Sequence, residues 1–304
     1  MSRLNTYLLL LFVMVIWGLN VVAVKFLVEH MPPVQMQGLR IGLAGICALL
    51  AVCLLREMKS LSKKQWRIVL AASLFGQVGH HSLLAVGLTQ TTAANGSLIL
   101  GLIPLTTAVL AMIFLGDPLT RWRFAGIALG FTGISFIILN PEEGVAMISS
   151  GDLYIFLSML SQAFSFILIK RASGTISPRW MTALMLLIGS VSLLVMSFFV
   201  EPGGFSLTSQ TGLVWFVFLS SAILATGLGH LLFNAAIQKI GPGQTALFNN
   251  FVPFFALIGS YFLLGESIYI TQILGFIFIV AGVLFGTGYI EQTVLKKKRA
   301  VLRK

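Results

Sequence analysis

The chain has 304 residues, of which 57% are hydrophobic and only 10% are charged, and its formal net charge is +11. Its mean hydropathy of +0.97 lies far outside the range of water-soluble proteins, because a soluble domain of this length could not bury so many apolar side chains. Composition therefore excludes a soluble protein and indicates a chain that uses lipid as its solvent.

Ten apolar runs follow one another, each close to the roughly 20 residues that cross a bilayer as a helix. Their approximate ranges are 7–28, 34–55, 67–88, 93–115, 122–139, 152–170, 180–200, 212–237, 244–264 and 270–290. The first run follows Arg3 as a signal peptide would, but it is too long for one and contains Trp17 and Asn20. We therefore predict an all-α integral membrane protein with ten transmembrane helices and no cofactor or metal.

Lysine and arginine gather in alternate links between the runs, and this pattern predicts the orientation in the membrane. The basic residues of these segments are Arg3, Arg56, Lys59, Lys63, Lys64, Arg67, Arg121, Arg123, Lys170, Arg171, Arg179, Lys239, Lys296, Lys297, Lys298, Arg299, Arg303 and Lys304. The opposite links hold Glu142, Glu143 and Glu201 instead. By the positive-inside rule, both termini lie in the cytoplasm of a multi-pass protein of the cytoplasmic membrane. The basic tail is expected to contact the anionic surface of the lipid bilayer and not nucleic acid.

An internal repeat is visible in the second part of each half. The stretch 79–139 matches 228–288 at a constant offset of 149, which pairs His81 with His230 and Pro104 with Pro253. Five helices per half is an odd number, so the second half enters the membrane in the opposite sense and the repeat is inverted. We expect a first repeat at residues 1–140, a second, inverted repeat at 150–290 and a basic cytoplasmic tail at 291–304.

Two motifs carry a resemblance to a known family. Trp17-Gly18-Leu19-Asn20, followed by Lys25 and Met31-Pro32-Pro33, resembles the opening of the EamA family of the drug/metabolite transporter superfamily. The Pro…Leu-Gly-Asp/Glu…Gly pattern of both halves is similar to the duplicated domain of that family. The resemblance covers essentially the whole chain. It implies a ten-helix inverted-repeat carrier, in a family that often exports amino acids or related metabolites, but it does not name a substrate.

Pro104 and Pro253 are expected near the middle of their helices. A proline there frees the carbonyl four residues earlier, here that of Leu100 and that of Asn249, and unpaired backbone at that depth survives only inside protein or beside a wet cavity. Each proline is therefore either a kink that aids packing or a helix break that lines a central cavity. Asn249 and Asn250 place further polar groups beside Pro253, which favours substrate binding there.

Arg40 and Lys25 are the cations within apolar runs away from the cytoplasmic side. Arg40 is about 9 Å deep at the helical rise of about 1.5 Å per residue, where a charge usually faces the protein interior or water. Arg40 is predicted either to bind substrate or to hydrogen-bond the carbonyls of neighbouring helices. Lys25, nearer the end of its run, either binds substrate or reaches the outer headgroups.

The two matched histidines lie on polar helical faces. Gln77 precedes His81 by four residues, and Asn234 follows His230 by four, so each pair shares one side of a helix. Histidine exchanges protons near neutral pH, so His81 and His230 are candidates for coupling transport to protons. A hydrogen-bonded packing role is the alternative.

Two polar pairs match at an offset of 145. Trp17 and Asn20 correspond to Gln162 and Ser165, and the pairs form either opposite walls of a polar cavity or hydrogen bonds between helices. Glycines in two later runs are predicted to allow close helix packing, either within one chain or in a homodimer. These glycines are Gly126, Gly130, Gly133, Gly275, Gly282 and Gly286.

The first hypothesis for function is a secondary carrier that exports a small polar or zwitterionic metabolite, such as an amino acid, by alternating access. The alternatives are efflux of drug-like or toxic organic compounds, and a metabolite uniporter or exchanger without proton coupling. Exchange of protons for cationic drugs is disfavoured, because no Asp or Glu lies in the middle of a predicted span. An intramembrane enzyme is unsupported, because the chain has no His-Glu-x-x-His or Gly-x-Ser-x-Gly pattern. A channel is a further hypothesis, and it would need a continuous pore lined by charges or carbonyls.

Overall fold

The computed structural model describes residues 3–116, 118–138, 149–172, 174–201, 203, 210–230, 232–233, 236 and 248–291, and all regular secondary structure in them is helical. We call residues 3–138 the first half and residues 149–291 the second half. Asp117, Glu142, Glu143, Asn234 and the basic tail after Glu291 lie outside the described residues.

The first half contains α1 to α7 and one π-helical segment, η1. Their bounds are α1 Arg3–Val28, α2 Pro33–Leu54, α3 Lys63–Ser73, η1 Leu74–Gly79, α4 His80–Leu88, α5 Ala93–Leu100, α6 Ile103–Leu115 and α7 Arg121–Ile138. The described part of the second half contains α8, α9, α10, α13 and α14 and two π-helical segments. Their bounds are α8 Ser150–Ala172, α9 Pro178–Val200, α10 Gly212–Ser220, η3 Ser221–Leu228, α13 Phe251–Gly259, η4 Ser260–Leu264 and α14 Ile270–Gly286.

Six helical stretches of the described residues are long and apolar enough to cross a membrane. They are Leu4–Val28, Pro33–Leu54, Lys63–Leu88, Ala93–Leu115, Ser150–Ala172 and Pro178–Val200. Large apolar side chains are also exposed on the outside of the molecule, among them Phe131, Phe198, Phe216 and Phe262. Such a surface is stable only against lipid. The predicted all-helical membrane protein is confirmed at this level.

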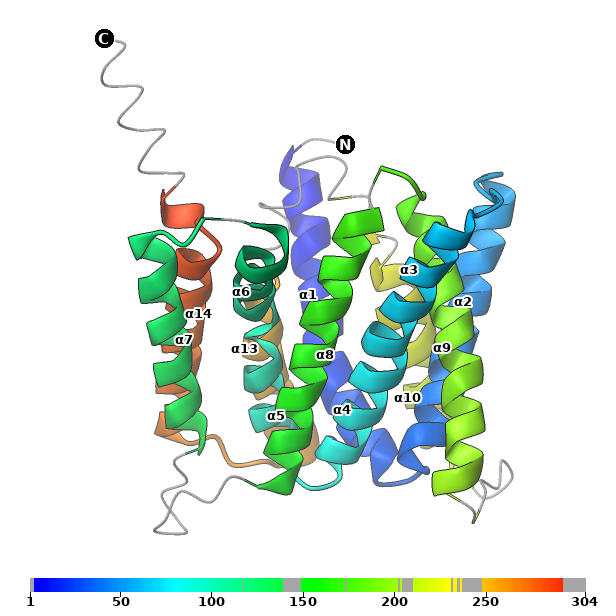
Figure 1. Cartoon of the computed structure of the whole chain (residues 1–304). Helices are drawn as coiled ribbons and strands as arrows, with labels where there is room; N and C mark the ends of the chain where they lie inside the picture. Colours follow the sequence, from blue (N-terminus) through cyan, green and yellow to red (C-terminus); the bar gives the residue numbers. More distant parts are fainter. Residues whose placement is uncertain are drawn as a thin grey trace.

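The helices stand side by side in one bundle (Figure 1). The pair α7 and α14 forms one edge and the pair α2 and α9 forms the other, and each pair is in extensive contact. Between these edges, α1 packs against α13 and η3, while α8 packs against α4, α6 and η1. In Figure 1, α1 begins at the upper end of the bundle, whereas α8 begins at the lower end.

The predicted glycine contacts lie within this one chain, between α7 and α14. A Cβ atom added to Gly282 would lie 2.8 Å from the backbone nitrogen of Gly130, and one added to Gly133 would lie 2.9 Å from the carbonyl oxygen of Gly275. Only a residue without a side chain fits these positions, so the two backbones approach directly. The homodimer remains a prediction that no contact in the structure tests.

Pro104 lies in the middle of the helical stretch Ala93–Leu115, as expected, but the expectation that Pro253 lies in mid-helix is wrong. Pro253 is the third residue of α13, which follows a turn at Asn249 and Asn250, and Pro104 is the second residue of α6. A proline in the first turn replaces an N–H that has no intrahelical acceptor, so it costs no hydrogen bond there. The carbonyl of Asn249 is not free, because it accepts a hydrogen bond from the Val252 backbone N–H at 3.0 Å.

The two interrupted helices meet each other in the bundle. The break between α5 and α6 passes through Gly101, and a Cβ atom added there would lie 2.9 Å from Cγ of Pro253 in α13. The missing side chain of Gly101 thus makes room for the proline ring of the other half.

Two glutamates of the second half cap helices of the first half. Glu201 follows α9, and its two carboxylate oxygens accept from the backbone N–H groups of Val34 and Gln35, each at 2.8 Å, at the start of α2. Glu266 follows η4 and accepts in the same way from Ala93 at 2.8 Å and Ala94 at 3.0 Å, at the start of α5. Each carboxylate satisfies two N–H groups that the helix cannot pair and complements the positive end of its dipole.

A third glutamate joins the halves at the opposite end of α2. Glu57 accepts hydrogen bonds from the Arg179 guanidinium, at 2.9 Å from its Nε, and from the Ser177 hydroxyl at 3.1 Å, at the start of α9. The donated hydrogen bond from Arg179 lowers the pKa of Glu57 below its ordinary value. Thus α2 and α9 are tied together at both of their ends.

We predict that the replacements Glu201→Gln and Glu266→Gln each lower the free energy of unfolding by about 1 kcal/mol, because the amide keeps one acceptor oxygen but loses the charge and the second acceptor. Denaturant titration of the purified protein in detergent measures this change. Glu29→Gln is the matched control, because Glu29 is half-exposed and pairs only with Lys25 one turn away, so its change should stay within about 0.5 kcal/mol. Equal stability of all three variants would contradict the capping role.

We also predict that Gly101→Ala destabilises the protein by about 1–3 kcal/mol, because the new methyl group overlaps Pro253 and the carbonyl oxygen of Leu98. The control is Gly212→Ala, since a Cβ atom there meets nothing within 4 Å. The same denaturant titration compares the two variants. A Gly101→Ala protein as stable as the Gly212→Ala protein would show that the helix breaks do not need this close contact.

Candidate functional site

The matched histidines each follow a π-helical segment. In the first half η1 ends at Gly79, directly before His80 and His81, and in the second half η3 ends at Leu228, two residues before His230. A π-helical turn carries one extra residue, which shifts the side chains before it relative to those after it, and such turns are frequent at functional sites. The equivalent placement of η1 and η3 gives each half one irregular helix next to its histidine.

Arg40 of α2 is the centre of a buried polar cluster. Its side chain is 1% exposed, and all of its nitrogens donate hydrogen bonds. Nε and Nη2 donate to Oε1 of Gln37 at 2.9 and 2.6 Å, and Nη1 donates to the hydroxyls of Ser221 and Thr226 at 3.1 and 3.0 Å. Nη2 also approaches Nδ1 of His81 at 3.4 Å. Side chains from α2, α4 and η3 therefore meet on one guanidinium.

All partners of Arg40 within the described residues are neutral acceptors. The ion pairs found there are Lys25 with Glu29 and Arg179 with Glu57, and neither includes Arg40. The sequence prediction that Arg40 faces the protein interior is therefore correct, but its partners are side chains and not backbone carbonyls. The guanidinium is satisfied in hydrogen bonds while its charge is not neutralised by a described side chain.

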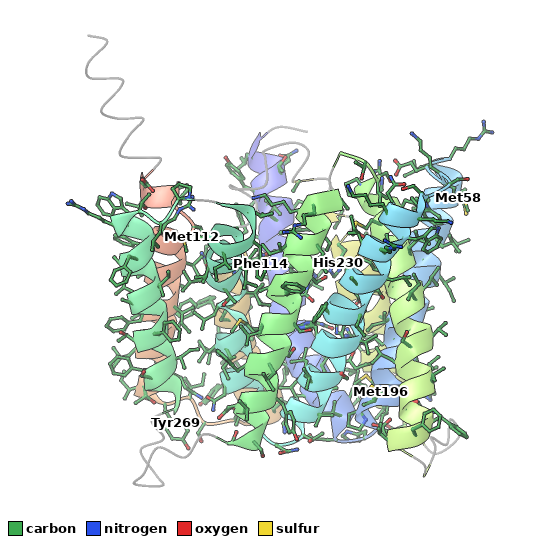
Figure 2. The ribbon with its side chains drawn as sticks, viewed as in Figure 1. Met58, Met112, Phe114, Met196, His230 and Tyr269 are labelled. Carbon is green, nitrogen blue, oxygen red and sulfur yellow. The ribbon has the colours of Figure 1, made fainter. Side chains whose placement is uncertain are left out.

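The first helix completes the cluster. The amide oxygen of Asn20 accepts a hydrogen bond from the Ser221 hydroxyl, and Nε1 of Trp17 donates to the carbonyl of Ala225 at 2.9 Å. The Trp17 ring also lies 5.1 Å from that of His230, whose Nδ1 donates to the carbonyl of Thr226 at 2.8 Å. In Figure 2, His230 is labelled at a height between Met58, near the upper end of the bundle, and Met196, toward the lower end. The structure thus brings together five predicted site residues, namely Trp17, Asn20, Arg40, His81 and His230.

The remaining candidates have other surroundings. Ser165 of α8 donates to the carbonyl of Ala72 in α3 at 2.9 Å, and Gln162 has a buried amide oxygen without a partner. Asn250 is buried beside the break before α13, and the side-chain oxygen of Asn249 is buried without a partner. No described hydrogen bond links these four to Arg40. Asn234 lies outside the residues that the structure describes.

Three residues of the cluster, Gln37, Ser221 and Thr226, were missed by reasoning from sequence. Gln37 precedes Arg40 by three residues on an apolar helix, and this spacing was a usable signal. Ser221 and Thr226 gave no signal in the sequence, because their shared contact with Arg40 depends on the π-helical turn that separates them. His80 exchanges hydrogen bonds with Ser158 of α8, whose Oγ lies 2.8 Å from Nδ1.

A small cavity lies beside the cluster, between α2, α9 and η3. It is lined by Ala48 of α2, by Arg179, Thr182 and Leu186 of α9, and by Thr226, Gly227 and His230. Arg179 lies in the first turn of α9 and is partly exposed, while Thr226 bonds Arg40. The cavity therefore lies between the partly exposed Arg179 and a threonine that bonds Arg40.

Lys25 takes no part in this cluster. Its ammonium group donates to the carbonyl of Leu88, at the end of α4, at 2.9 Å and pairs with Glu29 at 3.0 Å. These partners hold Lys25 at the end of the helix, where it stabilises the unpaired carbonyl of α4.

Comparison with known proteins identifies the family. The model of the EamA-like transporter family matches the chain twice, at residues 4–139 and 149–287. A relative from Bacillus subtilis, called "Uncharacterized transporter YyaM", is 33% identical over 295 residues, which cover 96% of each chain. A "Probable amino-acid metabolite efflux pump" from Salmonella typhimurium is 28% identical over 301 residues, 93% of this chain and 94% of that protein. A solved crystal structure shares the fold, with a TM-score of 0.68 and 16% identity over 96% of this chain and 99% of the other.

The family resemblance seen in the sequence motifs is confirmed, and the enzyme alternative is excluded by membership in a transporter family. The chain is a multi-pass membrane transporter that belongs to the EamA-like transporter family.

Proposed function

We propose that this transporter is a secondary carrier that exports a small polar metabolite, an amino acid or a related compound, across the cytoplasmic membrane by alternating access. The observation that carries the proposal is the buried cluster around Arg40, because a charge at membrane depth is costly and usually marks a substrate path. The direction and the substrate class are supported by the name of the Salmonella relative, a probable amino-acid metabolite efflux pump.

The proposed architecture is ten spanning helices in two inverted five-helix repeats, at residues 1–140 and 150–290. It is supported by the opposite starting ends of α1 and α8 in Figure 1 and by the equivalent positions of η1 and η3. The paired edges, α2 with α9 and α7 with α14, also fit a two-fold relation between the halves, because each pair joins equivalent helices of the two repeats.

Both termini are proposed to lie in the cytoplasm. The upper end of the bundle in Figure 1 holds the start of α1 and the start of α3, where Lys63 and Lys64 lie. The positive-inside rule assigns this end to the cytoplasm. Glu201 and Glu266, which cap α2 and α5 at the other end, are then on the outer side.

In this orientation, the proposed transport cycle starts from a state closed on the outer side. The Glu201 and Glu266 caps join the two halves there. The Glu57 contacts with Arg179 and Ser177 join α2 and α9 on the inner side in this same state. Opening to the outside requires the two caps to separate from α2 and α5 while the Glu57 contacts are kept. Rocking of one half against the other around a fixed central site produces this change.

We predict that Arg40→Gln abolishes transport, or reduces its rate at least about tenfold, while folded protein remains in the membrane, because the neutral side chain cannot attract an anionic group of the substrate. Arg40→Lys should restore only part of the activity, since lysine lacks the planar fork of donors. Arg67→Gln is the control, because Arg67 is exposed on α3 and should transport as the wild type does.

The measurement is counterflow of labelled threonine, leucine, phenylalanine and cysteine in proteoliposomes, with and without an imposed pH gradient. Saturable counterflow of at least one amino acid by the wild type supports the carrier, and a response to the gradient would assign protons as its coupling ion. The absence of counterflow for all four overturns the proposed substrate class. Normal transport by Arg40→Gln removes Arg40 from the mechanism.

A further inference from the structure

We infer that Arg40 and Gln37 form a subsite for a carboxylate group of the transported molecule. The inference rests on the proposed function and deepens it, because it names the chemical group that the carrier requires. It also assigns a substrate-binding role to Gln37 of α2.

The first step is the charge of the site. Each of the six acidic residues in the described part of the chain has a partner other than Arg40. These pairs are Glu29 with Lys25, Glu57 with Arg179, Asp152 with Thr91, Glu201 with the start of α2, Glu266 with the start of α5, and Glu291 with Thr120. No described acidic side chain therefore neutralises the Arg40 guanidinium, and a bound anion would do so.

The second step is an unused donor next to that charge. Gln37 is 0% exposed, and its Oε1 accepts from Nε and Nη2 of Arg40. Its Nε2, bonded to the same carbon atom, is buried and has no hydrogen-bond partner. A buried N–H group without an acceptor is costly, so this amide lacks an oxygen that a ligand can supply.

The third step is the replacement of two hydroxyl partners of Arg40 by the oxygens of the ligand. Nη1 of Arg40 is occupied by two hydroxyls, those of Ser221 and Thr226, and both belong to η3 of the other half. Thr226 also lines the small cavity between α2, α9 and η3, so this side of the guanidinium lies next to that cavity. When η3 moves away from α2, carboxylate oxygens can replace the hydroxyls, keep the number of hydrogen bonds and add the charge that the hydroxyls lack.

A carboxylate fits this subsite better than a phosphate. The cluster carries one fixed guanidinium charge and offers planar donors on a guanidinium and an amide, which match a planar monoanion. A phosphate dianion would retain one buried negative charge. An amino acid meets the requirement through its carboxylate.

The sharpest test is Gln37→Glu. The new carboxylate takes the position where Oε1 already accepts from Arg40, so it neutralises the guanidinium permanently and removes the Nε2 donor. We expect a protein at least as heat-stable in detergent as the wild type but with counterflow of amino acids reduced at least tenfold. Gln77→Glu is the matched control, because the Gln77 side-chain oxygen is buried and makes no hydrogen bond to Arg40. At position 77 no guanidinium bonds the new carboxylate, so a buried charge is left unpaired and the variant should be less stable than the wild type.

A binding measurement tests the subsite without any transported substrate. Sodium acetate should raise the unfolding temperature of the detergent-solubilised wild type by about 2 °C or more relative to equal sodium chloride, and acetamide should not. The acetate effect should vanish in Gln37→Glu. Gln37→Met, which removes the amide at similar volume, should lower the affinity for acetate at least several-fold and keeps the test decisive if the glutamate variant does not fold.

The outcomes separate the two proposals. Counterflow by the wild type that is blocked equally by an amino acid and by its carboxamide overturns the carboxylate subsite while leaving the carrier in place. Wild-type counterflow in Gln37→Glu, or acetate stabilisation that persists in it, overturns the subsite as well. If acetate binds as expected but no amino acid is transported, the subsite stands and the proposed substrate class fails.

Discussion

A guanidinium inside a hydrocarbon layer must have every N–H group bonded, and this requirement organises the centre of the protein. Arg40 gathers Gln37 from its own helix, His81 from α4 and two hydroxyls from η3. Asn20 then joins α1 to the same group through Ser221. Removing any one partner would leave a buried donor or acceptor unpaired, so these helices share one polar cluster inside the bundle.

The ends of the helices follow the same rule. A helix that starts at the membrane surface has backbone N–H groups without intrahelical partners, and Glu201 and Glu266 supply the missing oxygens from the opposite half. The halves are therefore joined by groups that could equally be bonded by water. These contacts are therefore replaceable, whereas the α7–α14 contact, made by backbone against backbone, has no such alternative.

Sequence reasoning predicted the features that depend on composition and on local periodicity. The apolar runs predicted the helices, the matched prolines predicted that two helices are interrupted, and the depth of Arg40 in its run predicted that its side chain is buried. The predictions that failed or fell short depend on where a helix begins and on distant partners. Pro253 was placed in mid-helix because the turn at Asn249 and Asn250 has no strong local signal, and the Glu201 cap joins residues 167 positions apart.

The π-helical segments have a consequence for how relatives of this protein are compared. A π turn holds one more residue than an α turn, so deleting one residue from 74–79 or 221–228 would convert it to a regular turn while the helix on either side keeps its facing. In the second segment, Ser221 and Thr226 are five residues apart, and a deletion between them would leave a spacing of four, which keeps both hydroxyls on one face of a regular helix. A single-residue gap at these positions in an alignment therefore marks the loss of a π turn inside a helix, although it resembles the trimming of a loop.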